Sequence, residues 1–199
     1  MGRTLRYLFA MLCGAVPALA LFWCLRPMRR RRLREKGLCS SPCREAVLAL
    51  FWMYCGGAAI LGLTPRWVVR ALAGLPLGMP WNPEDLPVFS PGNVSLVPFG
   101  TFSDSTYILA ANVILLMPFG LFSALLWRNY GWKRALLTGV CITLFIESCQ
   151  LFIGRTFDID DLMLNTLGVF CGFLLSPIFR RLFPRLTEKL SVSALTSSD

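Results

Sequence analysis

Residues 135–179 read ALLTGVCITLFIESCQLFIGRTFDIDDLMLNTLGVFCGFLLSPIF and are the most informative part of the chain. They comprise two apolar runs, Ala135–Ile153 and Leu162–Phe179, separated by the polar segment Gly154–Asp161. The hydrocarbon core of a bilayer is about 30 Å thick and is spanned by roughly 20 apolar residues in a helix. The stretch therefore predicts two transmembrane helices joined by a short hairpin.

The composition of the whole chain extends this prediction. Of its 199 residues, 55% are hydrophobic and only 16% are charged, which is too apolar for an ordinary soluble domain of this size. Three further apolar runs are long enough to cross a bilayer, namely Leu5–Leu25, Ala46–Leu63 and Tyr107–Leu126. We predict an all-α polytopic transmembrane helix bundle of about five spans.

The cationic residues predict the orientation of this bundle. The formal net charge is +9, and Lys and Arg are concentrated in segments 26–36, 128–134 and 180–189, which follow the first, third and fifth spans. We expect the first two to be short loops, and short Lys/Arg-rich loops stay cytoplasmic, which places the N-terminus outside and the C-terminus inside. Cleavage of the first span as a signal peptide would break this pattern. The distribution argues against nucleic acid as a partner and suits contact with anionic lipids.

The eight cysteines predict neither a disulfide framework nor a metal site. Six of them lie within apolar spans, where a thiol packs as a small hydrophobic group. Cys39 and Cys43 lie in a segment expected to be cytoplasmic, which disfavours a disulfide, and a zinc site would need a second pair of ligands. We therefore expect no cofactor.

Two similar motifs precede and enter the third span. Each has an asparagine, an apolar stretch and a Pro-Phe-Gly break. The similarity could also arise by chance, from two unrelated helix breakers. Non-helical backbone within a membrane is tolerated only where it is buried in protein or lines a cavity, so we expect the first copy to dip into the outer leaflet, the second to kink the third span, and both to border one cavity. The motif residues are Asn93, Pro98, Phe99 and Gly100 in the first copy, and Asn112, Pro118, Phe119 and Gly120 in the second.

Polar residues are predicted to form a layer near the outer ends of the last three spans. Helical rise places the deeper members roughly 5–9 Å inward from those ends. A structural ion pair between Arg155 and Glu147 or Asp158 would explain only two residues of the layer, which has more members than that. Ionisable residues inside a membrane usually mark a functional site. The predicted ligand-binding residues are Asn112, Glu147, Gln150, Arg155, Asp158, Asp161 and Asn165.

Three chemistries remain open for this layer. Carboxylates can hold Ca²⁺ or Mg²⁺, with Asp158, Asp160 and Asp161 as the candidate ligands, although we expect no metal. Arg155 can grip a phosphate or carboxylate with two hydrogen bonds. Two carboxylates can share acid and base roles. The chain has no histidine, which excludes Ser-His catalysis, and we assign no catalytic residues.

Gly168 and Gly172 in the fifth span have the four-residue spacing that lets another helix approach closely. The partner helix could belong to the same chain or to a second copy in a homo-oligomer.

The ordered set of motifs from Asn93 to Gly168 resembles the VanZ family of bacterial membrane proteins. The resemblance covers roughly residues 92–176 and rests on Glu147-x2-Gln150-x4-Arg155-x2-Asp158-x2-Asp161-x3-Asn165-x2-Gly168 with the two Pro-Phe-Gly motifs before it. It implies a small multi-span protein of the bacterial plasma membrane, whose namesake is associated with resistance to teicoplanin-type glycopeptide antibiotics. It implies no catalytic residue, cofactor or mechanism.

These observations divide the chain into three parts. Residues 1–91 hold two N-terminal spans, 92–179 form the VanZ-like membrane domain, and 180–199 form a basic cytoplasmic tail. We expect the protein to bind an amphipathic envelope molecule at an outer-leaflet pocket. The candidates are membrane lipid, a lipid-linked cell-wall precursor or the glycopeptide antibiotic.

Two other functions remain open. An enzyme acting on a lipid-linked substrate would use Glu147, Asp158 and Asp161 as acid, base or metal ligands. A purely structural membrane partner would tolerate conservative changes in the polar layer. Transport is disfavoured, because the five predicted spans show no duplication of halves.

Overall fold

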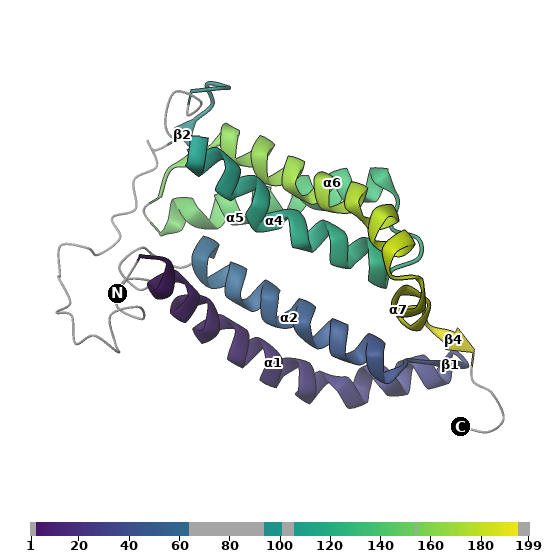
Figure 1. Cartoon of the computed structure of the whole chain (residues 1–199). Helices are drawn as coiled ribbons and strands as arrows, with labels where there is room; N and C mark the ends of the chain where they lie inside the picture. Colours follow the sequence, from purple (N-terminus) through teal and green to yellow (C-terminus); the bar gives the residue numbers. More distant parts are fainter. Residues whose placement is uncertain (1–2, 64–93, 101–105, 154, 195–199) are drawn as a thin grey trace.

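The computed structural model describes residues 3–63, 94–100, 106–153 and 155–194 (Figure 1). Five helices in these residues are long and apolar enough to cross a membrane, which confirms the prediction of an all-α bundle of five spans. The elements in chain order are α1 (Arg3–Glu35), β1 (Leu38–Cys39), α2 (Pro42–Leu63), β2 (Val94–Ser95), α4 (Thr106–Leu126), α5 (Trp132–Phe152), β3 (Phe157–Asp158), α6 (Ile159–Leu182), α7 (Pro184–Lys189) and β4 (Ser193–Ala194).

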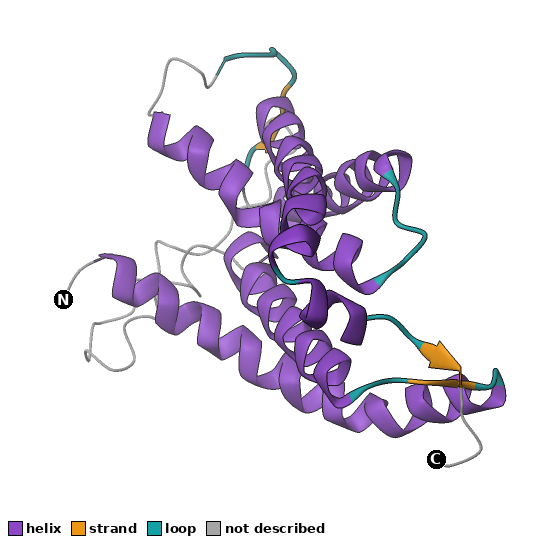
Figure 2. Ribbon diagram, turned by 45° about the vertical axis from the view of Figure 1, so that its right-hand side comes forward, coloured by secondary structure: helices purple, strands orange, loops and turns teal. Residues whose placement is uncertain are grey.

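The long helices form two groups. Helices α1 and α2 pack along each other, and α6 packs along both α4 and α5, whereas α2 makes the smaller contact that joins the groups (Figures 1 and 2). Phe51 of α2 carries much of this contact, because its ring centroid lies 5.3 Å from that of Phe119 and 5.7 Å from that of Phe122, both on α4. The division leaves room for a cavity between α2 and the second group.

Glycines bring the helices of each group close together. A Cβ atom added at Gly172 would overlap the carbonyl oxygen of Met117, and one added at Gly120 would overlap that of Val169. Helix association in a membrane relies on such close packing, because lipid tails are as apolar as the side chains. The predicted glycine motif at 168 and 172 therefore packs within the chain, against α4, and α4 continues through Pro118 without ending.

The arginine run differs from the prediction. It was expected to be a loop, but α1 continues through it to Glu35. Arginine is a good helix former, and ion pairs hold the extension. Arg31 Nε lies 3.2 Å from Glu35 Oε1 within α1. Arg26 and Arg29 both pair with Glu45 of α2. The run therefore fixes α1 against α2.

Charged side chains also tie the other helices together at this end of the bundle. The buried Arg44 donates from Nε to the carbonyl of Leu190 at 2.9 Å and from Nη2 to the carbonyl of Leu126 at 3.0 Å. Strand β4 pairs antiparallel with β1, with Leu38 opposite Ala194 (Figure 2). The basic tail predicted after the fifth span is thus folded back, as α7 and β4, onto the segment between α1 and α2.

Replacing Gly172 by alanine should destabilise the protein. The new methyl group would meet backbone of α4, and overpacking of this kind costs about 1–3 kcal/mol. Thermal unfolding in detergent measures the effect as a lower Tm. Gly131→Ala is the matched control, because a Cβ there has nothing within 4 Å. Equal melting of the two variants would show that the α4–α6 contact tolerates a larger separation.

Candidate functional site

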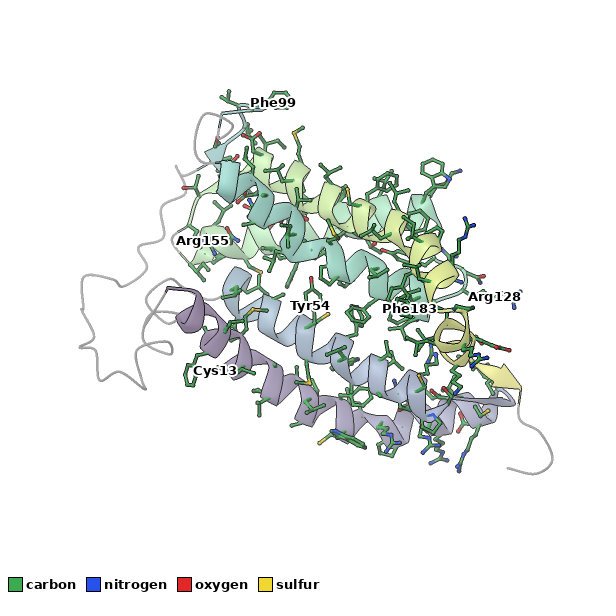
Figure 3. All side chains as sticks on the ribbon, in the orientation of Figure 1. Cys13, Tyr54, Phe99, Arg128, Arg155 and Phe183 are labelled. Atoms are coloured by element: carbon green, nitrogen blue, oxygen red, sulfur yellow. The ribbon has the colours of Figure 1, made fainter. Side chains whose placement is uncertain are left out.

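A cavity of about 290 Å³ lies between α2, α4, α5 and α6. Most of its wall is apolar and includes Tyr54 of α2, Leu116 and Phe119 of α4, and Ile146 of α5. Figure 3 shows Arg155 at the end of the bundle opposite Arg128, with Tyr54 between the two groups of helices. Six of the seven predicted ligand-binding residues line this cavity: Asn112, Glu147, Gln150, Arg155, Asp161 and Asn165.

Glu147 is the most enclosed of these side chains. Thr143, Glu147 and Gln150 are buried on one face of α5, as their spacing requires, and Glu147 is 0% exposed. Its Oε2 accepts a hydrogen bond from the backbone N–H of Asp158 at 3.2 Å. Its Oε1 is buried and has no hydrogen-bond partner among the described residues. An unpaired buried acceptor costs about 1–3 kcal/mol, which a purely structural role does not explain.

The first turns of α6 supply the opposite wall. Asp158 caps the helix by accepting the N–H of Asp160 at 2.9 Å. Asp161 accepts a hydrogen bond from the Asn112 side chain of α4. One turn further, Asn165 is buried, and its Oδ1 has no partner in the part of the chain that the structure describes. Asp158 itself does not line the cavity and contributes through its backbone contact to Glu147.

The last turn of α2 closes the site, a contribution that the sequence analysis missed. Gln150 Nε2 donates to the carbonyl of Gly62 at 3.1 Å, and Arg155 Nη1 donates to the carbonyls of Gly62 at 3.3 Å and Leu61 at 3.4 Å. The last four carbonyls of a helix lack partners within it and attract cations. The signal available in the sequence was that general need of a helix end, beside the amide and guanidinium donors of the polar layer.

The described residues of the first Pro-Phe-Gly motif, 94–100, are not among those that line this cavity. This segment is held on the hairpin instead, because β2 pairs in parallel with β3 and the N–H of Phe99 donates to Asp160 Oδ1 at 2.7 Å. Phe99 adopts a positive φ of 65°, an uncommon conformation for a residue other than glycine. The second copy lines the cavity through Asn112 and Phe119. Asn93 of the first copy lies outside the described residues.

The three candidate metal ligands have separate contacts. Asp158 caps α6, Asp160 holds Phe99 and Asp161 contacts Asn112. Within the described ranges, no group of three or more His, Cys, Asp or Glu side chains is placed to hold a metal ion. The charged and amide groups that line the cavity are the carboxylates of Glu147 and Asp161, the guanidinium of Arg155, and the amides of Asn112, Gln150 and Asn165.

Asp160→Ala should release the segment 94–100. Loss of a hydrogen bond to a charged group would speed amide exchange at Phe99 about tenfold to a hundredfold. Hydrogen exchange of peptides covering this segment measures the effect, and Asp160→Asn, which keeps an acceptor oxygen, should be affected less. Glu35→Ala at the opposite end is the control. Unchanged exchange in Asp160→Ala would mean that the strand pairing alone holds the segment.

Comparison with known proteins bears on the whole region just described. The family model VanZ/LLP1 matches residues 46–180. The match takes in α2, which the motifs alone had left outside the resemblance, together with the helices that enclose the cavity. No curated protein and no solved structure matches the chain. A match over this much of the chain shows that the protein is a member of the VanZ/LLP1 family.

Proposed function

We propose that this protein binds an amphipathic molecule of the bacterial cell envelope in the cavity between α2, α4, α5 and α6. The observation that carries the proposal is the division of the cavity wall: charged and amide side chains gather at one end, and apolar side chains form the rest. The polar head of the ligand would contact Glu147, Asp161 and Asn165, and its apolar part would lie along Tyr54 and Phe119.

The burial of the polar groups supports a binding role. Ionisable residues within a membrane span are costly and are kept where they serve a function. Glu147 and Asn165 each present an unpaired buried oxygen in the described structure, whereas a site built only to hold helices together would pair them.

The size of the cavity narrows the ligand. At about 290 Å³ it lies near the lower end of the roughly 300–1,000 Å³ typical of ligand pockets. It therefore suits a lipid headgroup, a part of a lipid-linked cell-wall precursor, or the acyl chain of a lipoglycopeptide rather than a whole antibiotic. Binding there would contribute to teicoplanin-type resistance, the role that the VanZ resemblance implies.

Loss of the site should remove resistance. In a susceptible bacterium that expresses the protein, Glu147→Gln and Arg155→Ala should return the inhibitory concentration of teicoplanin to that of the empty vector. Glu35→Gln makes the same chemical change as Glu147→Gln at the opposite end and should keep resistance. Membrane abundance of every variant is measured by immunoblot. Full resistance in both site variants, with normal abundance, would refute the proposed function.

The proposal places the cavity in the outer leaflet of the plasma membrane. Arg26 and Arg29 pair with Glu45 near the end of α1 that leads into β1. Figure 1 shows β1 at the end of the bundle opposite β2, and a positive end stays cytoplasmic.

A C-terminal green fluorescent protein fusion should therefore fluoresce, because the fused domain folds in the cytoplasm, and a C-terminal alkaline phosphatase fusion should be inactive. A fusion after Leu63 should give the reverse pattern. Active phosphatase at the C-terminus would invert the orientation and move the cavity to the inner leaflet.

A further inference from the structure

We infer that the head of the bound molecule carries a primary amine, held as an ammonium by Glu147, Asp161 and Asn165. The inference rests on the proposed binding function and names the chemistry of its ligand. It follows from which hydrogen-bonding groups in the cavity wall lack partners and from the charge that they carry.

The unpaired groups are both acceptors. Glu147 Oε1 on α5 and Asn165 Oδ1 on α6 are buried without a partner among the described residues, and both side chains belong to the wall of the same cavity. A carboxylate and an amide oxygen accept hydrogen bonds, so the partner that they lack is a donor. The Glu147 side chain has rotatable bonds that can turn its unpaired oxygen from the wall into the cavity.

The charges in the wall favour a cationic donor over a neutral one. Two carboxylates, Glu147 and Asp161, and one guanidinium, Arg155, line the cavity, so it is net negative when all three are ionised. Arg155 donates to carbonyls at the end of α2. A ligand hydroxyl would satisfy an oxygen and leave the excess negative charge, whereas a cationic ligand satisfies the oxygen and offsets the charge.

The acceptors favour a primary amine over a quaternary ammonium or a divalent cation. An ammonium has three N–H donors, and three acceptor-bearing side chains, from two adjacent helices, face one cavity. A quaternary ammonium has no N–H and would leave both oxygens unpaired. A divalent cation needs several oxygen ligands, and the described residues hold no group of three His, Cys, Asp or Glu side chains placed for one.

Such an amine can belong to a lipid headgroup or to a small soluble molecule. The test compares nanodiscs that contain equal amounts of phosphatidylethanolamine, phosphatidylcholine and phosphatidylglycerol with matched acyl chains. Native mass spectrometry of the released protein measures which lipid stays bound. A second arm uses nanodiscs of phosphatidylglycerol alone with added ethanolamine.

The expected result is retention of phosphatidylethanolamine over the other two lipids by about tenfold, the difference that one charge-assisted hydrogen bond makes. Glu147→Gln and Asn165→Leu should lose this preference, while Asn165→Asp, which keeps an acceptor, and the control Glu35→Gln should keep it. Elution as a single monodisperse peak is required of each variant. Binding of ethanolamine in the second arm, without a preference in the first, would support a soluble amine as the source.

Two outcomes would overturn the inference, and they differ in what else they affect. Retention of phosphatidylcholine or phosphatidylglycerol that depends on Glu147 would refute the amine and leave the proposed binding function standing. If neither arm shows any retention that depends on Glu147, the inference and the lipid-binding function both fail.

Discussion

The carbonyl of Gly62, in the last turn of α2, accepts hydrogen bonds from Gln150 and Arg155, and the shape of the site depends on this contact. Backbone groups at the end of a membrane helix need partners, because lipid supplies none. The donors come from the α5–α6 hairpin, so satisfying α2 also draws the first helix group onto the second.

Close packing of α4 on α6 places the remaining polar groups. The backbone of Val113 lies against Gly168, and that of Met117 lies against Gly172. In this register the Asn112 side chain reaches Asp161, in the first turn of α6. Small residues in the middle of the bundle thus determine which polar side chains meet at its end. The same packing holds β3 where it can pair with β2, and the segment 94–100 lies over the hairpin as a result.

Much of the fold could be predicted from the sequence because a membrane imposes simple requirements. Span number follows from hydropathy and bilayer thickness. Helical rise predicted similar depths for Asn112, Glu147 and Asn165, and all three line the cavity. Spacing along a helix does not reveal which neighbour a face meets, so the contribution of α2 was missed. Arg155 is an example: its partners are carbonyls about ninety positions earlier in the chain.

Two features differ from what the residue patterns predicted, each for its own physical reason. Residues 26–35 were expected to be a loop because charge ends a membrane span, but charge does not end a helix, and arginine favours one. The motif at Pro98 was expected to line the cavity because it resembles the one at Pro118. A backbone hydrogen bond from Phe99 to Asp160, which no residue pattern announces, holds it elsewhere.

The contacts of Arg44 also bear on how the protein is made. Its two carbonyl acceptors lie 82 and 146 positions further along the chain, so the ribosome produces the guanidinium long before either of them. Insertion of α1 and α2 into the bilayer precedes completion of this network. Nascent chains would therefore pass through a stage in which α1 and α2 are inserted but Arg44, which is buried in the finished fold, still faces solvent or lipid headgroups. At this stage chaperones and membrane proteases can recognise incomplete molecules.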